Sequence, residues 1–234
     1  MAAPTLSTGM IGAAVWDNRR MAPRFTLLTL GFIGVAGIFG LGAALIRHRT
    51  SGNVANHAPI ELVTGSYVSP SRPLPNFSLI DQHGRAFGPA NLRGAWSMMF
   101  FGYTSCPDFC PTTLTTLAAL EKRLRAGAAP VRPQVIFVSV DAKRDTPEQL
   151  ALYLPNFDPE FIGLGAASQA GIETFATTLG VGVDVTPRAG MYTVDHTNAI
   201  FVLNPAGRLT AILTGPFTVE ALRADLQRIV AGPT

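Results

Sequence analysis

The chain is 234 residues long, with 47% hydrophobic residues and a formal net charge of +3, from 18 Lys and Arg against 15 Asp and Glu. That length allows one domain of ordinary size plus an appendage. The positive excess lies before residue 71, because residues 71–234 hold thirteen basic and thirteen acidic side chains. A neutral globular part has no basic surface for phosphate backbones, so we expect no nucleic-acid partner.

The N-terminal part indicates a membrane anchor. Residues 1–26 are small, polar and contain proline, as expected of a cytoplasmic tail. Residues 27–46 carry no charge, and twenty helical residues at about 1.5 Å each span roughly 30 Å of hydrocarbon. Arg47-His48-Arg49 follows in place of a signal-peptide cleavage site. We predict one transmembrane helix over residues 27–46, with the arginine-richer N-terminal side in the cytoplasm.

Next along the chain, a linker and a β-hairpin are expected. Residues 47–73 contain scattered Ser, Gly, Asn and Pro without periodicity, which indicates a linker, so the folded domain is expected over residues 74–234. Residues 77–87 predict a β-hairpin with Gly84 in its turn.

The remaining elements alternate between strands and helices. Apolar runs and helical periodicity predict a strand at 96–103, a helix at 111–125, a strand at 135–140, a helix from Pro147 with Thr146 as N-cap, a helix at 168–179, strands at 198–203 and 208–213, and a helix at 218–230. This order predicts an α/β, thioredoxin-like fold with an N-terminal β-hairpin, in which parallel strands are joined by crossovers and one edge is antiparallel.

The only two cysteines of the chain, Cys106 and Cys110, lie between the strand at 96–103 and the following helix. Their spacing of four lets both thiols chelate one metal ion or form a disulfide. A purely structural disulfide would close a very short loop, and the stabilisation falls as the loop shortens. Helix N-terminal amides stabilise thiolates, so the junction suits reactive thiols.

A metal site at these thiols would use a third ligand, and the chain has four histidines. We expect His48 at the membrane flank, His57 in the linker and His83 in the hairpin turn to be solvated. His196 lies just before the strand at 198–203, where a thioredoxin-like fold brings the chain against the cysteine loop. His196 is therefore the candidate third ligand.

Three motifs in this order resemble the Sco/SenC family. They are Cys106-Pro107-x-x-Cys110-Pro111, Ser139-Val140-Asp141 through Arg144-Asp145-Thr146-Pro147, and Val194-Asp195-His196-Thr197. The resemblance extends from about Leu74 to Val230, and a preceding anchor also fits the family. Ala142 stands where the family usually has Pro, and residues 161–165 lack a Thr that commonly follows Gly-Leu. Neither departure touches a proposed ligand.

The resemblance implies a metallochaperone and not an enzyme. Such a protein binds one copper, as Cu(I) or Cu(II), through Cys106, Cys110 and His196, and helps to load the dinuclear copper centre of cytochrome c oxidase. The implied partners are an upstream copper donor protein and the copper-accepting oxidase subunit. The implied location is the inner membrane, single-pass, with the domain in the periplasm or the mitochondrial intermembrane space.

The chemistry of the ligands agrees with copper but leaves zinc open. Thiolates favour Cu(I), and imidazole also suits Cu(II). Two cysteines and one histidine with an open fourth position are also a zinc arrangement. Two carboxylates are candidates for orienting the metal ligands without binding the metal themselves. They are Asp141 at the end of the strand at 135–140 and Asp195 beside His196.

Two other functions compete with this prediction. A thiol-disulfide oxidoreductase would keep oxidase cysteines reduced, or act as a redox sensor, by forming a Cys106–Cys110 disulfide. Such enzymes typically use Cys-x-x-Cys and a cis-proline before the facing strand, whereas residues 189–203 contain no proline and His196 occupies that place. A thiol peroxidase ranks last, because the chain shows no dedicated donor for a peroxide.

Overall fold

The computed structural model describes residues 60–188 and 191–233, without the side chains of Val185, Pro187, Arg188 and residues 191–196. The predicted tail, the predicted anchor over residues 27–46 and the linker up to residue 59 lie outside the described residues. Within the described part of the chain, no helix is long and apolar enough to cross a membrane.

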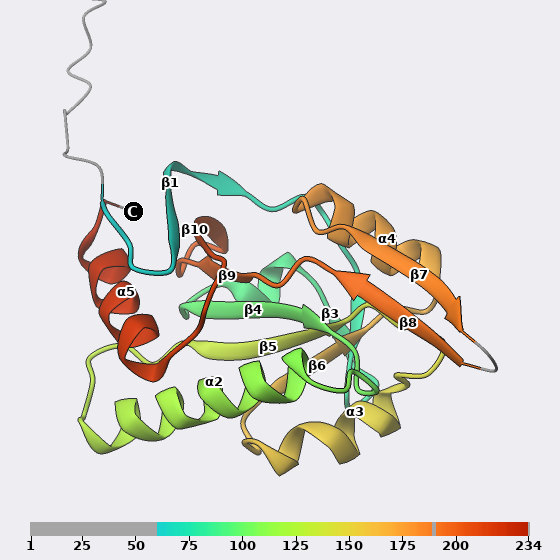
Figure 1. Ribbon diagram of the computed structural model, residues 1–234. Coiled ribbons are helices and arrows are strands. Elements are labelled where there is room, and N and C mark those ends of the chain that lie inside the picture. The colour runs from blue at the N-terminus through green and yellow to red at the C-terminus, as the bar shows by residue number, and fades with distance from the viewer. Residues whose placement is uncertain (1–59, 189–190, 234) are drawn as a thin grey trace, which may run out of the picture. The chain divides into compact units, whose positions relative to one another are not determined.

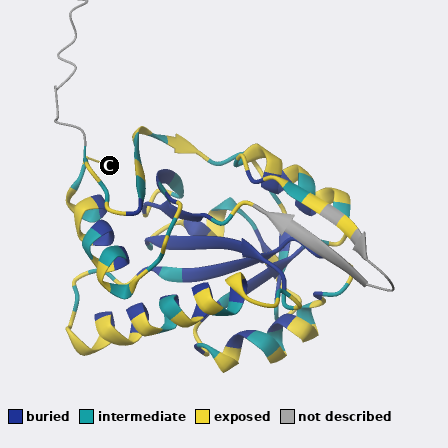
Figure 2. Cartoon of the chain, in the orientation of Figure 1, coloured by how far each residue is buried: buried dark blue, intermediate teal, exposed yellow. Residues whose placement is uncertain are grey.

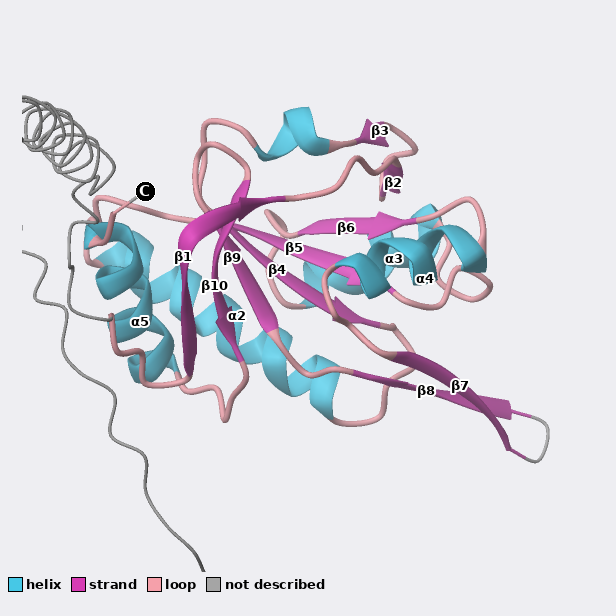
Figure 3. Ribbon diagram, turned by 90° about the horizontal axis from the view of Figure 1, so that it is seen from above, coloured by secondary structure: helices cyan, strands magenta, loops and turns pink. Residues whose placement is uncertain are grey.

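In the described residues, ten strands form two sheets. Their bounds are β1 Gly65–Pro73, β2 Leu79–Asp81, β3 Ala86–Phe87, β4 Ser97–Gly102, β5 Gln134–Ser139, β6 Ile162–Gly165, β7 Val183–Arg188, β8 Met191–His196, β9 Ile200–Leu203 and β10 Arg208–Leu213. The main sheet has the order β1-β10-β9-β4-β5-β6-β2-β3, and β7 pairs only with β8 among the described strands. Figures 1 and 3 show the β7–β8 hairpin extending away from the main sheet.

Between residues 60 and 233, four helices are described, and they pack against the main sheet. Their bounds are α2 Phe109–Ala126, α3 Pro147–Tyr153, α4 Gln169–Thr178 and α5 Val219–Ala231, with 3-10 turns η1 Pro89–Leu92 and η2 Leu154–Asn156. In Figure 1, α2 and α3 lie below the sheet and α4 lies above it. The predicted N-cap Thr146 is confirmed, since its side chain accepts a backbone N–H at the start of α3. Ser168 and Thr218, which were not predicted as caps, do the same for α4 and α5.

The core lies on the two central strands, which Figure 2 shows as the most buried part of the sheet. All six residues of β4 are buried, and β5 is buried from its second residue onward. The two strands run parallel in register from Ser97↔Gln134 to Gly102↔Ser139. Their continuous apolar sequences are typical of strands that are covered on both faces.

The predicted strands, helices and N-terminal hairpin are confirmed, but the extent of the sheet differs from the prediction. Residues 65–73, assigned to the linker, form β1 and pair with β10. No residue of β1 is fully buried, so this edge strand lacks the apolar pattern that would have identified it. The prediction had one antiparallel edge. In the structure, antiparallel strands flank the parallel strands β4, β5 and β6 on both sides, β9 beside β4 and β2 beside β6.

A buried carboxylate attaches the first described residues to α5. Asp225 has 0% exposure and accepts hydrogen bonds from the Val63 and Thr64 backbone N–H groups at 2.6 and 2.8 Å and from the Thr64 hydroxyl at 2.7 Å. The Arg228 Nη1 lies 3.8 Å from the Asp225 Oδ1. Hydrogen bonds to a charged acceptor are stronger than those between neutral groups. Asp225 therefore fixes Val63 and Thr64 against α5.

Replacing Asp225 with Asn is expected to destabilise the domain. The amide keeps the shape but presents an NH2 group to backbone N–H donors, which leaves buried groups unpaired. We expect the free energy of unfolding of Asp225→Asn, measured by urea titration, to fall by about 2–4 kcal/mol. The matched control is Gln227→Ala, an exposed position of the same helix, for which a change below about 0.5 kcal/mol is expected. Equal unfolding curves for the parent and Asp225→Asn would contradict this role.

Candidate metal centre

The two cysteines lie where β4 passes into α2. Cys106 is in the connecting loop, where its N–H donates to the Tyr103 carbonyl at 3.2 Å, and Cys110 is the second residue of α2. Both are free thiols, and their side chains are joined by a hydrogen bond. The predicted spacing therefore does bring the two sulfur atoms together.

The two thiols differ in their access to solvent. Cys110 has 0% exposure, whereas Cys106 is partly exposed. Gly102 makes room for the buried thiol, because a Cβ at this position would lie 2.9 Å from the Cys110 Sγ and 2.6 Å from the Phe137 ring. The site thus has an outer and an inner sulfur atom.

The environment of Cys110 favours its protonated form. The hydrogen bond to Cys106 and then burial raise the pKa of the Cys110 thiol well above its usual value, and the negative charge of Asp145 adds to the effect. A backbone hydrogen bond from Tyr103 acts in the opposite direction. The stabilisation of thiolate expected from the helix N-terminus is therefore outweighed at Cys110 in the metal-free state.

Asp145 fixes the start of the cysteine loop. Its carboxylate is buried and accepts hydrogen bonds from the Thr104 N–H at 2.9 Å, the Thr104 hydroxyl at 2.6 Å and the Ser139 hydroxyl at 2.7 Å. Burial raises the pKa of Asp145, although these hydrogen bonds partly offset the shift. Asp145 lies in a motif that resembles the Sco/SenC family, but it was not predicted as a site residue. The sequence did contain a pattern that could have identified Asp145. Thr104 and Ser139 lie at the ends of the two central apolar strands, and their hydroxyl groups need a hydrogen-bond acceptor.

Asp141, which was predicted to support the metal ligands, is also buried, but its carboxylate pairs with an arginine side chain. It forms an ion pair with Arg144 and accepts the Arg144 N–H at 3.3 Å. The Arg144 guanidinium lies over the Tyr103 ring, 5.6 Å from its centroid. Asp141 therefore acts on the loop after β5 through Arg144, and the carboxylate whose charge reaches Cys110 is Asp145.

His196 is placed by its backbone only. It is the last residue of β8 and pairs with Val183, and its side chain lies outside the described residues, as does that of Asp195. The base of the hairpin is held by Thr197, whose N–H donates to the Gly182 carbonyl at 3.3 Å and whose hydroxyl accepts the Gly182 N–H at 3.1 Å. Among the described side chains, no group of three or more His, Cys, Asp and Glu could hold a metal ion.

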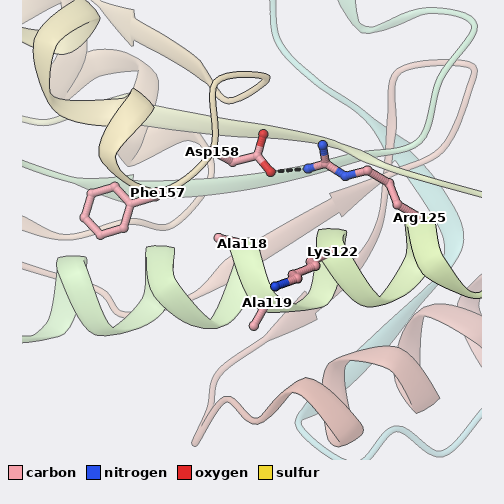
Figure 4. A pocket seen from close by; sticks show the side chains of 6 residues that line it. All are labelled: Ala118, Ala119, Lys122, Arg125, Phe157 and Asp158. Atoms are coloured by element: carbon pink, nitrogen blue, oxygen red, sulfur yellow. Dashed lines mark hydrogen bonds and ion pairs between the residues drawn. The ribbon is translucent and has the colours of Figure 1, made fainter.

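A groove along α2 is not lined by either cysteine. It has a volume of about 410 Å³ and is shown in Figure 4; its lining residues are Ala118, Ala119, Lys122, Arg125, Phe157 and Asp158. An ion pair between Arg125 and Asp158 closes one side. None of these residues belongs to the predicted site.

The chemistry of the thiol pair fits a soft metal ion. Two reduced sulfur atoms lie side by side at a strand-to-helix junction, and metal binding displaces their protons. Soft thiolate ligands select ions such as Cu(I) and zinc. The same pair can form a disulfide, so the geometry is compatible with metal binding and with thiol exchange.

Comparison with known proteins agrees with the fold and the motifs. A model of the SCO1/SenC family matches residues 68–231. The human mitochondrial SCO2 homolog is 35% identical over 159 residues, which are 67% of this chain and 59% of the human protein. The match thus covers less than two thirds of that relative.

Two solved structures with copper bound are similar to this chain. ScoI of Arabidopsis thaliana has a TM-score of 0.63 and 30% identity, and the match covers 67% of this chain and 96% of that one. ScoI of Bradyrhizobium japonicum has a TM-score of 0.59 and 37% identity, with 67% and 99% covered. This likeness confirms the predicted α/β, thioredoxin-like fold.

The unequal burial of the thiols predicts unequal reactivity. In the reduced, metal-free chain we expect iodoacetamide to modify Cys106 at least about tenfold faster than Cys110, because Cys110 is buried and its pKa is raised. Mass spectrometry of the two modified positions over time measures both rates. In urea, where the environments become equal, the rates should converge. Equal rates in the folded chain would contradict the described asymmetry.

Proposed function

The chain belongs to the SCO1/SenC family, as its three motifs predicted, and on this premise we propose that it is a copper metallochaperone of cytochrome c oxidase assembly and not an enzyme. The observation that carries the proposal is the reduced thiol pair, Cys106 and Cys110, on the loop between β4 and α2. Family relatives named as copper-bound support the choice of metal.

The proposed ligands are Cys106, Cys110 and His196. Thiolates bind Cu(I) strongly, and an imidazole extends the ligand set to Cu(II), so the site can receive copper in either state. Cys106 is the more exposed of the two sulfur ligands, which makes it the point where copper enters and leaves. Cys110 is closed off from solvent and would keep hold of the ion during transfer.

Carboxylates near the ligands have supporting roles in this proposal. Asp141 positions the loop after β5 through its ion pair with Arg144. Asp195 is adjacent to His196 in β8 and stays a candidate partner of its imidazole. Asp145 joins them as the residue that holds Thr104, two residues before Cys106.

The chain's placement in the cell follows from the predicted anchor over residues 27–46. We propose a single-pass inner-membrane protein whose domain faces the periplasm or the mitochondrial intermembrane space. There it would receive copper from a donor protein and pass it to the subunit that carries the dinuclear copper centre. The globular part is neutral, so recognition of either partner does not depend on a large net charge.

Thiol-disulfide exchange is the second candidate, favoured by the unequal exposure of the two thiols. Cys106 would attack a disulfide of an oxidase subunit, and one partner sulfur would leave as a thiol. Cys110 would then attack the mixed disulfide, releasing the second partner thiol and leaving a Cys106–Cys110 disulfide. Two electrons pass to the partner, so the activity needs no metal.

Copper binding by ligand variants separates the two candidates. We expect the reduced full-length chain to bind one copper, and Cys106→Ser, Cys110→Ser and His196→Ala each to lose tight binding, measured by copper analysis after dialysis against a chelator. His83→Ala, an exposed histidine of the β2–β3 turn, is the matched control and should bind like the parent.

Two results would contradict the proposed function. If His196→Ala retained copper in both oxidation states as tightly as the parent, the three-ligand site would be wrong. If the parent bound no copper yet reduced a disulfide of an oxidase subunit peptide, the exchange activity would replace the metallochaperone.

A further inference from the structure

Phe109, the first residue of α2, exposes a large apolar side chain next to the thiols in the sequence. Its exposed fraction is 63%, and among the described residues the other large apolar side chains that are exposed, Val63 and Leu152, are not aromatic. Covering a phenylalanine side chain removes about 150–250 Å² of surface from water. Because Phe109 is mostly exposed in the domain, most of this area is available to a partner.

The first three turns of α2 carry no charged side chain. Residues 109–120 contain no Asp, Glu, Lys or Arg, whereas residues 121–125 contain four such residues. Thr112 follows Phe109 by three residues and Thr116 follows Thr112 by four, so the three share one side of the helix. We call Phe109, Thr112, Thr115 and Thr116 the neutral face of α2. The cores of protein interfaces are depleted in charge and enriched in aromatic residues, so this face has the composition of an interface.

The threonine hydroxyls of this face already have acceptors in the helix or at its N-cap. Thr115 donates to the Pro111 carbonyl at 2.8 Å, and Thr116 donates to the Thr112 carbonyl at 3.0 Å. The Thr112 hydroxyl lies 3.4 Å from the Asp108 Oδ1. Burying a hydroxyl is costly when it loses its hydrogen bonds. An apolar partner can therefore cover the neutral face of α2 without leaving these groups unpaired.

Phe109 is close enough to Cys106 to contact the same partner. The two are three residues apart in the sequence, so their Cα atoms are separated by at most about 11 Å. An interface of standard size buries about 800 Å² on each partner, which corresponds to a disc of about 16 Å radius. Cys110 is buried and Cys106 is partly exposed, so a partner approaches the thiols on the side of Cys106. Phe109 thus lies within the contact area of a partner centred on Cys106.

We propose that the neutral face of α2 docks the domain of the oxidase subunit that accepts copper, with Phe109 as the anchor of the contact. The inference rests on the proposed function and names the surface that its partner binds. A small carrier can load the partly exposed thiol without a docking surface. Removing copper from the buried Cys110 requires an acceptor ligand that is held at the site until the exchange is complete, which favours the acceptor as the occupant.

The neutral face of α2 also defines the chemistry of the partner surface. Asp108 is the only charged residue between positions 104 and 120, so the match is an apolar depression beside the partner's own copper ligands. Docking through charged patches weakens steeply as the ionic strength rises. Docking through the neutral face of α2 is expected to depend little on salt.

The test measures copper transfer from the loaded full-length chain, in detergent, to the purified copper-free soluble domain of the oxidase subunit. We expect Phe109→Ser and Thr116→Lys each to raise the acceptor concentration that half-saturates transfer at least about tenfold, because an anchor is lost or a charge is buried. The transfer rate at saturating acceptor, and copper loading from a Cu(I)–glutathione complex, should equal those of the parent. For the parent, a change from about 20 to about 200 mM salt should alter the half-saturating concentration by less than about twofold.

Val63→Ser is the matched control. Val63 has a similar exposed fraction of 58%, and its backbone N–H binds Asp225 of α5 instead of a residue of α2. The control should transfer copper like the parent. A second measurement needs no copper: the dissociation constant of the complex between the metal-free chain and the acceptor domain, measured by calorimetry, should rise at least about tenfold in Phe109→Ser.

Unchanged half-saturation in both α2 variants would overturn the proposal, as would an equal loss in Val63→Ser. Slower loading from Cu(I)–glutathione in Phe109→Ser would also overturn it, because Phe109 would then act on the metal site. A parent dimer that Phe109→Ser dissociates, with transfer unchanged, would assign the face to a second copy of the chain. Failure of the parent to load copper would instead count against the proposed function. The calorimetric comparison then decides on docking alone, and no difference between the parent and Phe109→Ser overturns the docking surface.

Discussion

The hydrogen bonds that Asp145 accepts from Thr104 and Ser139 fix the start of the loop that carries Cys106 and Cys110. They join the ends of the two central parallel strands, β4 and β5, which are also linked there by the Val140 N–H and the Gly102 carbonyl at 2.8 Å. The carboxyl ends of parallel strands are where open α/β sheets carry their working residues. A buried charge with three donors makes this junction rigid, and the cysteine loop starts from it.

Because the start of the cysteine loop is fixed at Thr104, the two cysteines differ in burial. Cys110 is carried inward by the first turn of α2, into space that exists because Gly102 has no side chain. Cys106 remains in the loop and reaches solvent. One thiol therefore suits exchange with a partner and the other suits retention, a division of roles that serves transfer of copper as well as transfer of electrons. The Phe137 ring lies beside the inner thiol, since a Cβ on Gly102 would meet both of them.

Local sequence patterns predicted the elements that carry the cysteine loop, because β4 and β5 are continuous apolar runs and α2 has apolar residues at helical spacing. They could not predict β1, an exposed edge strand stabilised by its pairing with β10, or β6, whose two glycines remove the apolar pattern. Gly163 packs closely against η2, since a Cβ there would lie 2.6 Å from the Leu154 Cδ1. Asp145 was missed for a related reason. Its burial depends on contacts with Thr104 and Ser139, which lie in other segments, and its own neighbours in the sequence are polar.

X-ray absorption spectroscopy of the copper-loaded full-length chain tests the central claim most directly, because it reports the atoms bound to copper. The account predicts two sulfur ligands and one imidazole nitrogen per copper, with both sulfur signals lost together when Cys106 and Cys110 are replaced by Ser. A copper ion bound only by nitrogen and oxygen, or by four sulfur atoms from two chains, would contradict it.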